Sequence, residues 1–287
     1  MSTASLQKSI QQLRLGFLGA GSITEAMLTG ICKQNLLDPD HIFVTNHGDD
    51  ERLEFLQQRF GVHPTRDKKA MLESCDTLIL AMKPKDAREA CIALRGIIRR
   101  DQLIISLIAG IPTDLIATWL NVDCPIIRTM PNTSSAIGLS ATGISAGRFA
   151  EQKHMDVAYH LFTSIGTVFP LPESELDIVT GLSGSGPAYV YYLVEAMELA
   201  GQKAGLSAEM SRQLTVQTLL GAAHMLQHTQ TEPAVLRKKV TSPGGTTQAG
   251  IEVLEAYRFQ EAVTAAILRA TQRARELGAQ HENTSIS

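Results

Sequence analysis

Apolar and polar positions follow two different patterns along the chain. Up to residue 129, short apolar runs alternate with longer stretches in which apolar residues recur at helical spacing. Strands that alternate with helices predict an α/β domain built on a parallel, doubly wound sheet. The predicted strands lie at residues 14–18, 42–46, 77–82, 103–108 and 126–129.

The strand pattern ends near residues 170–172. From residue 173 to 277 the apolar positions recur at helical spacing and are interrupted by Gly and Pro. Ser-Gly-Pro at 185–187 predicts the start of a helix over 188–204, and the sequence SPGGTT at 242–247 predicts the start of another. We therefore expect an all-α second domain. The predicted divisions are a polar lead at 1–12, an α/β domain at 13–171, a helical domain at 172–279 and a tail at 280–287.

Composition and charge narrow the class of protein. The 287 residues suit two domains at roughly 150 residues each. The chain has 26 Lys plus Arg against 29 Asp plus Glu, a net charge of −3 with no long block of either sign. This balance disfavours binding to nucleic acid or to an anionic membrane.

Targeting signals and cysteines indicate the compartment. No apolar stretch approaches the ~20 residues of a membrane-spanning helix, and the first residues lack the apolar core of a secretory signal. The four cysteines are widely separated in the sequence and form no Cys-x-x-Cys pair. We expect a cytoplasmic protein with reduced thiols.

A glycine turn follows the first predicted strand and precedes the first predicted helix. In that context Gly19 permits a tight turn, and Gly21 lets backbone amides approach a pyrophosphate at the positive end of the helix. Thr24 stands at the usual third glycine position. Either helix and strand lie farther apart there, or the threonine hydroxyl folds onto the backbone. The pattern predicts that residues 13–171 bind a dinucleotide.

The end of the second strand bears on which dinucleotide is bound. An Asp or Glu there favours NAD, but the strand ends in Asn46-His47-Gly48. The missing carboxylate favours NADP and leaves NAD open. Arg52, Lys68 and Lys69 are available cations, although each also suits an ordinary surface position.

Five segments together resemble one enzyme family: GFLGAG at 16–21, AMKP at 81–84, RTMPNT at 128–133, TGLSGSGPAY at 180–189 and VTSPGGTT at 240–247. From about Leu13 to Leu277 the chain resembles the pyrroline-5-carboxylate reductases. The resemblance implies NAD(P)H-dependent reduction of 1-pyrroline-5-carboxylate to L-proline, the last step of proline biosynthesis. It also implies a Rossmann-like first domain and a helical second domain that forms a homodimer, or a higher assembly such as a decamer.

The resemblance also implies site residues. The expected cofactor contacts are Gly19, Ala20, Gly21, Ser22, Ile23, Asn46, His47, Lys68, Ala81, Met82, Lys83, Pro84, Ala109, Gly110, Met130 and Asn132. The expected substrate contacts are Glu173, Ser242, Gly244, Gly245, Thr246 and Thr247. Thr247 and Lys83 are the candidate catalytic residues, Thr247 toward the ring nitrogen and Lys83 beside the nicotinamide.

Four positions depart from the family pattern. His47 stands where the family often has an Arg, and Ser134 stands where it usually has a Pro. Lys68 and Lys239 each stand where some members have an Asn. The preference for NADP is therefore less firmly based than the reductase activity.

The residue types suit the chemistry of a cyclic imine that bears a carboxylate. The glycine-rich opening at 242–247 offers amides and the positive end of a helix to an anion, a contact worth about 0.3–2 kcal/mol. Glu173 would attract a protonated imine. Hydride transfer to an iminium depends on placement rather than on a strong base. In keeping with this, residues 184–198 lack the catalytic Lys of the related β-hydroxyacid dehydrogenases.

Other interpretations of the same residues remain weaker. His224 and His228 have a metal-ligand spacing but no evident third ligand, so we expect no metal. Glu195 and Glu198 suit a solvated helix face. The alternatives for function are a reductase of another cyclic imino acid and a catalytically inactive NAD(P)-binding regulatory homologue.

Overall fold

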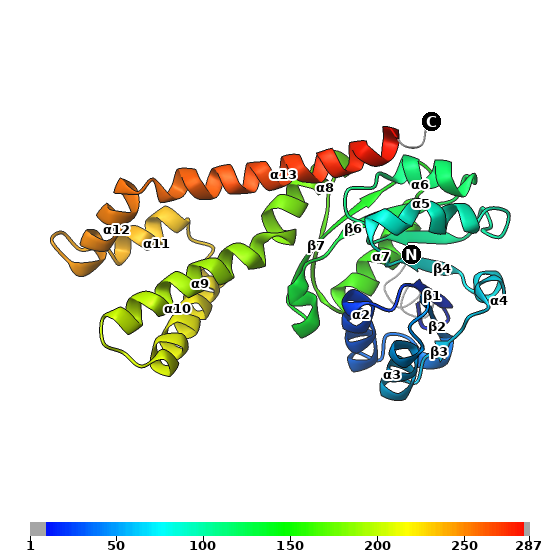
Figure 1. Cartoon of the computed structure of the whole chain (residues 1–287), viewed down its shortest axis with the longest axis horizontal. Helices are drawn as coiled ribbons and strands as arrows, with labels where there is room; N and C mark the ends of the chain where they lie inside the picture. Colours follow the sequence, from blue (N-terminus) through cyan, green and yellow to red (C-terminus); the bar gives the residue numbers. More distant parts are fainter. Residues whose placement is uncertain (1–9, 284–287) are drawn as a thin grey trace. The chain divides into compact units, whose positions relative to one another are not determined.

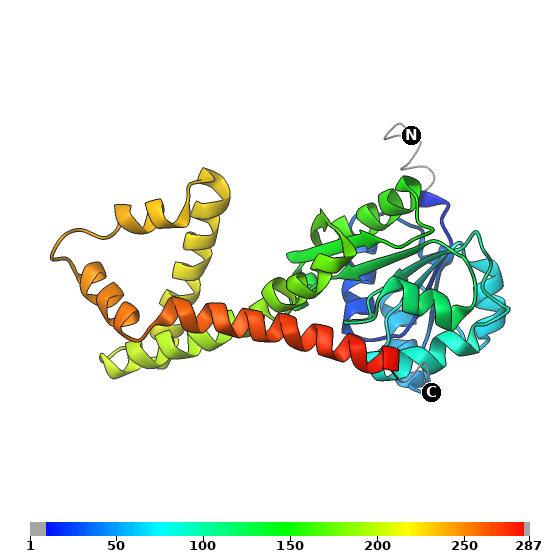
Figure 2. The same cartoon turned by 90° about the horizontal axis from the view of Figure 1, so that it is seen from above.

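The structure is a computed structural model that describes residues 10–283 (Figures 1 and 2). The chain divides into two compact units. The first comprises the chain up to Ser185 together with the segment from Arg269 onward, and the second comprises Gly186–Leu268. The long last helix therefore belongs to both units. The boundary predicted at residues 171 and 172 lies where the strands end, before the first unit does.

The first unit is built on an eight-stranded sheet in the order β3-β2-β1-β4-β5-β6-β7-β8. Neighbouring strands are parallel except β6 and β7, which are antiparallel. The first six strands in this order have the doubly wound arrangement in which ligands bind at the carboxyl ends beside β1. The strands are Leu15–Leu18 (β1), Ile42–Thr45 (β2), His63–Pro64 (β3), Thr77–Leu80 (β4), Leu103–Ser106 (β5), Ile126–Met130 (β6), Ser140–Ala146 (β7) and Gly166–Pro170 (β8).

Helices cover both faces of this sheet (Figure 1). Successive β1 residues point to opposite faces, so Phe17 packs on one side among α2, α3 and α7 while Leu18 packs on the other with α4, α5 and α6. The helices of this unit are Ser22–Lys33 (α2), Asp50–Phe60 (α3), Lys68–Ser74 (α4), Pro84–Ala93 (α5), Thr113–Leu120 (α6), Gln152–Thr163 (α7) and Leu176–Val179 (α8). Its single turns are Pro39–His41 (η1), Thr133–Ile137 (η2), Glu173–Glu175 (η3) and the π-helical Thr180–Gly184 (η4).

The predicted fold class is confirmed, with three strands added. All five predicted strands are present, and the sequence missed β3, β7 and β8. The polar strand β7 is stable because Ser140 and Thr142 are buried and hydrogen-bond each other at 2.9 Å. Its antiparallel pairing with β6 makes the sheet mixed rather than wholly parallel.

The second unit is helical. It contains Gly186–Lys203 (α9), Ala208–Thr229 (α10), Pro233–Lys239 (α11), Thr246–Ala256 (α12) and the first turns of Phe259–Asn283 (α13). The helices α9 and α10 are in contact. They approach closely at Gly201, where an added Cβ would lie 2.7 Å from Ser211 Oγ. Within the described residues, no helix is long and apolar enough to cross a membrane.

Candidate active site

The glycine turn between β1 and α2 leaves a helix end open to a ligand. Gly19 has a φ of +123°, and a Cβ there would lie 2.3 Å from the Ala81 carbonyl oxygen, so only glycine fits. At Gly21, the N-cap of α2, an added Cβ would meet nothing within 4 Å, and no side chain caps the helix. The first amides of α2 have no partner within the helix. This geometry fits a dinucleotide pyrophosphate.

Thr24 holds the turn from inside the helix. Its side chain is buried, and Oγ1 donates a hydrogen bond to the Gly19 carbonyl oxygen at 2.7 Å. Of the two outcomes considered for this position, the hydroxyl therefore folds onto the backbone.

Arg52 braces the same turn from α3. Its Nε donates to the Ala20 carbonyl oxygen at 2.7 Å, and its Nη2 lies 2.6 Å from Glu25. The carbonyls of the turn are thus held by Thr24 and Arg52, which leaves its amide side for a ligand. The sequence identified Arg52 only as an available cation.

A second arginine, missed by sequence reasoning, marks the end of β2. The Arg66 Nη1 donates to the Asn46 carbonyl oxygen at 2.7 Å and to its side-chain oxygen at 2.8 Å, and the guanidinium also pairs with Asp50. His47 and Lys68, both predicted cofactor contacts, are exposed. Because Arg66 follows β3, which was not predicted, its position beside Asn46 could not be expected from the sequence.

A cavity of about 360 Å³ lies beside the end of β6. Four of the predicted cofactor contacts line it: Ser22, Ile23, Met130 and Asn132. The structure adds other lining residues, among them Leu107 from the segment after β5 and Gly184 from η4. The start of α2 and the RTMPNT segment, far apart in sequence, therefore contribute to one cavity.

The remaining predicted contacts of the first unit lie at the ends of β4 and β5. Lys83 is the N-cap of α5 and is exposed, with Pro84 in the first turn of the helix. Gly110 has a φ of +76°, and an added Cβ would lie 3.2 Å from the Ala274 carbonyl oxygen of α13. The segment that carries Ala109 and Gly110 is thus packed against the last helix.

Both carboxylate oxygens of Glu173 accept hydrogen bonds from within the protein. Its Oε1 accepts a hydrogen bond from the Thr113 amide at 2.8 Å, and its Oε2 accepts one from Thr113 Oγ1 at 2.7 Å. The carboxylate thereby caps α6, whose N-cap Pro112 provides no side-chain hydrogen bond. A negative charge at a helix N-terminus is favourable. These contacts indicate a structural role for Glu173, which holds the start of α6 in place.

The other predicted substrate contacts lie at the start of α12, in the second unit. Gly245 is the N-cap, without a side-chain cap, and Gly244 has a φ of +71°. Ser242, Thr246 and Thr247 are exposed. The Gly244 amide donates to Gln248 Oε1 at 2.8 Å and the Gly245 amide to the Ser242 carbonyl oxygen at 3.0 Å. The helix N-terminus therefore offers an anion the amides that follow Gly245, together with the exposed hydroxyl groups.

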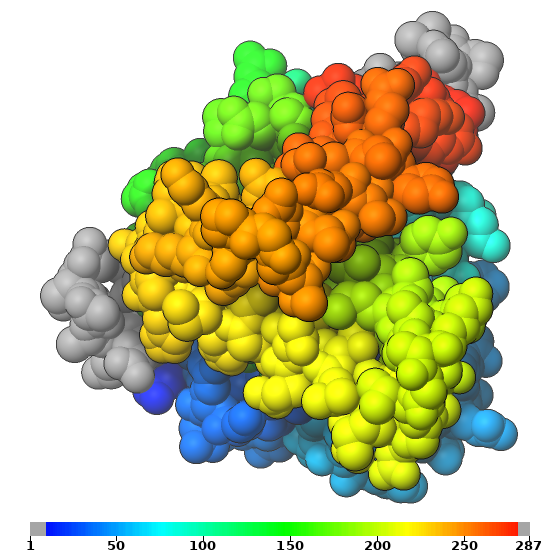
Figure 3. All heavy atoms as spheres, turned by 90° about the vertical axis from the view of Figure 1, so that its left-hand side faces the viewer, coloured from blue at the N-terminus to red at the C-terminus, as the bar shows by residue number. Residues whose placement is uncertain are grey.

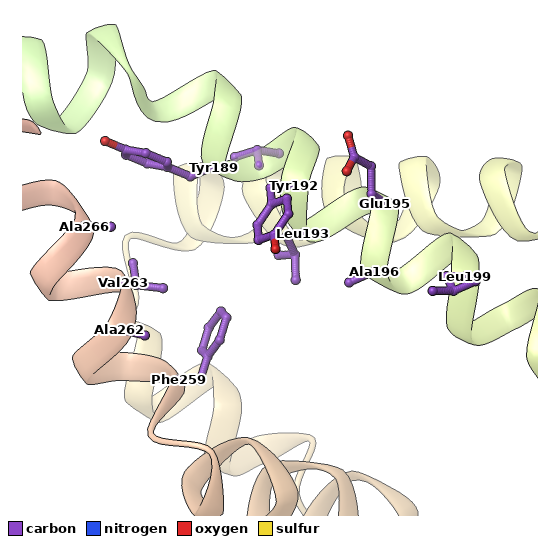
Figure 4. A pocket seen from close by; sticks show the side chains of 11 residues that line it. Tyr189, Tyr192, Leu193, Glu195, Ala196, Leu199, Phe259, Ala262, Val263 and Ala266 are labelled. Carbon is purple, nitrogen blue, oxygen red and sulfur yellow. The ribbon is translucent and has the colours of Figure 1, made fainter.

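The second unit also carries an apolar groove of about 740 Å³ between α9 and α13. Figure 4 shows Phe259 and Val263 of α13 facing Tyr192 and Leu193 of α9. Tyr192 is 78% exposed, and large apolar side chains of α10 and α12 are exposed as well. Figure 3 shows the outer surface of α10, in yellow, and of α12, in orange. So much exposed apolar surface is typical of a protein interface.

The His, Cys, Asp and Glu side chains of the described residues are the candidate ligands for a metal ion. Among residues 10–283, no cluster of three or more His, Cys, Asp or Glu could hold a metal ion. The rings of His224 and His228 stack on each other at 5.9 Å between centroids.

The fold and the open helix end are those of a dinucleotide-binding protein, and the chain adds a helical unit to them. Residues 173–277 match the family model "Pyrroline-5-carboxylate reductase dimerisation", and residues 14–110 match "NADP oxidoreductase coenzyme F420-dependent". The chain is 42% identical to pyrroline-5-carboxylate reductase 1 of Bacillus subtilis over 283 residues, which are 99% of this chain and 95% of the relative. The chain belongs to the pyrroline-5-carboxylate reductase family.

Solved structures agree with this family. A pyrroline-5-carboxylate reductase from Coxiella burnetii matches with a TM-score of 0.85 at 36% identity, covering 92% of this chain and 98% of the other. A Plasmodium falciparum pyrroline carboxylate reductase, solved with NADP bound, matches with a TM-score of 0.85 at 26% identity, covering 94% and 99%. The match to the dimerisation model indicates that the chain self-associates.

Proposed function

We propose that this protein reduces 1-pyrroline-5-carboxylate to L-proline with NADPH. The observation that carries the proposal is the pair of glycine-opened helix ends without a side-chain cap at the N-cap, α2 in the first unit and α12 in the second, in a chain of this family. One end suits a dinucleotide and the other a small carboxylate. A single-ligand binding protein would need only one of them.

The first unit holds the cofactor, which when bound supplies the hydride. The amides of Ser22 and Ile23, at the start of α2, receive the pyrophosphate. The cavity lined by Met130 and Asn132 receives the nicotinamide. Lys83, exposed at the end of β4, contributes positive charge and a hydrogen-bond donor beside the ring.

Arg66 provides the cation for the 2′-phosphate of NADP. It is held at the end of β2 by Asn46, where the dinucleotide fold recognises the adenosine ribose. Its partner Asp50 weakens the preference for a phosphate, because the two negative groups compete for one guanidinium. We therefore expect NADPH to be favoured over NADH by a moderate factor.

The second unit holds the substrate. Amides at the start of α12 and the hydroxyls of Ser242 and Thr246 receive the carboxylate, while Thr247 hydrogen-bonds the ring nitrogen and helps it receive its proton. Because an iminium is electrophilic without a base, the residues need only orient the ring. Glu173 is assigned a structural role, since both its oxygens already accept hydrogen bonds from Thr113.

The functional assembly is a homodimer, or a higher assembly of dimers such as a decamer. The apolar groove between α9 and α13 supports this, because a second copy would cover side chains that water now contacts. A cytoplasmic location is supported by the cysteines, since all four are free thiols.

Steady-state kinetics test this function. The purified chain should oxidise NADPH with 1-pyrroline-5-carboxylate, more slowly with the six-membered homologue, and proline should inhibit competitively with the substrate. Faster turnover of the six-membered ring would favour the alternative reductase. NADPH binding without turnover of either ring would favour the inactive homologue.

A substitution of Arg66 tests the proposed preference for NADPH over NADH. Arg66→Met should raise the KM for NADPH about 10-fold or more, and change that for NADH little. An equal effect on both cofactors would reduce Arg66 to a structural brace of Asn46.

A further inference from the structure

A buried arginine connects the segments that line the cavity beside β6. The side chain of Arg128, in β6, is only 6% exposed and lies between two carboxylates. Its Nη2 donates to Asp177 Oδ1 of α8 at 2.8 Å, and its Nη1 lies 3.7 Å from Glu173 Oε1 of η3. Because the donors of arginine form a planar fork, one side chain holds both acids in a fixed arrangement.

Glu173 connects Arg128 to the segment 107–112, which forms the first wall of the cavity. It caps Thr113 with both oxygens, at 2.8 and 2.7 Å. Thr113 begins α6 and follows the segment 107–112, whose first residue, Leu107, lines the cavity.

Asp177 connects Arg128 to η4, which forms the second wall of the cavity. The helix α8 continues directly into the π-helical η4, whose last residue, Gly184, lines the cavity. Single π-helical turns are common at functional sites. The third wall is β6 itself, which runs from Arg128 to Met130 within one strand.

The second and third walls are in contact on the cavity side. Asn132 Nδ2 donates to the Ser183 carbonyl oxygen at 3.1 Å. An added Cβ on Gly184 would lie 2.8 Å from Met130 Cε. A shift of η4 would therefore change the shape of the cavity at Met130.

We infer that Arg128 is a positioning residue for hydride transfer. Through Asp177 and Glu173 it fixes the three walls of the cavity, and thereby the position of the nicotinamide ring within the cavity. The inference rests on the proposed function, because only then does the cavity receive a nicotinamide. All three charged groups bond to other protein groups, and the proposed function assigns none of them to the substrate.

The expected kinetic effect follows from the distance dependence of the reaction. Donor and acceptor carbons must lie roughly 3–3.5 Å apart, and a misplacement of about 1 Å can cost about 100-fold in rate. The proposed contacts with the pyrophosphate and the 2′-phosphate are made by the start of α2 and by Arg66, and none of them involves Arg128 or its two acids. Loosening the walls should therefore lower kcat and leave the KM for NADPH nearly unchanged.

Variants of Asp177 and Arg128 in the full chain test this. Asp177→Ala should lower kcat about 10-fold or more, Asp177→Asn should retain part of the rate because it keeps an acceptor, and Arg128→Lys should fall below wild type because it loses the fork. With 4,4-dideuterated NADPH, the isotope effect on kcat should rise in the same order as kcat falls. A purely structural role would lower the melting temperature without moving the isotope effect.

The matched control is Arg95→Lys. Arg95 is an exposed arginine of the same unit whose Nε donates a part-buried hydrogen bond to the Trp119 carbonyl oxygen at 2.7 Å, and neither residue lines the cavity. It should change stability alone. If wild type is active but the Asp177 and Arg128 variants match this control in kcat and isotope effect, the inference is overturned. If Arg128→Lys does not fold, the Asp177 pair decides the question. Wild type without turnover would overturn the proposed function, and this inference with it.

Discussion

The hydroxyl of Thr24 has one partner in the structure, and removing it isolates the contribution of the glycine turn. Thr24 Oγ1 donates to the Gly19 carbonyl oxygen at 2.7 Å, and the side chain is fully buried. Thr24→Val keeps the shape of the side chain and removes only the donor. The Gly19 carbonyl oxygen then loses its hydrogen-bond donor in a part-buried place.

The cost can be worked from this geometry. A buried acceptor without a partner costs about 1–3 kcal/mol. At about 2–4 °C of melting temperature for each kcal/mol, Thr24→Val should melt about 2–12 °C below wild type. The freed carbonyl can also turn toward the pyrophosphate, so we expect NADPH to bind about 10-fold more weakly, equivalent to about 1.4 kcal/mol.

Thr29 provides a matched control in the same helix. Its Oγ1 donates to the Glu25 carbonyl oxygen at 2.8 Å, an acceptor that the helix also bonds. Thr29→Val should therefore cost less than about 1 kcal/mol and leave NADPH affinity unchanged. Thermal melts and calorimetric NADPH titrations measure both effects, and Thr24→Ser should stay near wild type. Equal results for Thr24→Val and Thr29→Val would refute the reasoning.

Three further predictions concern other parts of the chain. Thr247→Ala should lower kcat at least about 10-fold while NADPH affinity stays unchanged, because Thr247 is assigned to the ring nitrogen; equal losses in both would show a structural role. Gly278→Ala should destabilise the protein by about 1–3 kcal/mol, because its Cβ would lie 2.4 Å from the Gly110 carbonyl oxygen, whereas Gly250→Ala in open space should be neutral or stabilising in thermal melts. Burial raises the pKa of the Cys91 thiol from 9.0 to about 12, so its contribution to stability is complete below pH 9 and lost as the pH rises toward 12. At pH 10 about 1 kcal/mol should be lost, and Cys91→Ala should flatten the pH dependence of unfolding between pH 8.5 and 10 by that amount; an unchanged slope would contradict the assigned burial.

Local sequence signals predicted most of the elements. Glycine and capping residues at 185–187 predicted a helix over 188–204, and α9 spans Gly186–Lys203. The strand β7 escaped because its sequence, SATGISA, lacks the apolar run by which strands were recognised. Its polar residues are satisfied by contacts such as that between Ser140 and Thr142, which exist only after folding.

In the candidate site, too, features set by neighbouring residues could be predicted, whereas contacts between residues far apart in the sequence could not. The open helix ends at Gly21 and Gly245 could be predicted, because a glycine turn before a helix is a local pattern. The contacts of Glu173 and Arg66 could not be predicted from any local pattern. Thr113 lies 60 residues from Glu173, and Arg66 lies 20 residues from Asn46, so their pairing depends on the strand order of the sheet.

Because the first unit resumes at Arg269, the second unit is an insertion within it rather than an appendage to it. A shortened protein ending near Leu268 would keep every helix of the second unit but strip Thr271 and Ala274, both nearly inaccessible to water, from the dinucleotide-binding unit. Deletion from the carboxyl end should therefore damage cofactor binding first, and a proteolytic fragment that retains this capacity should contain both ends of the chain.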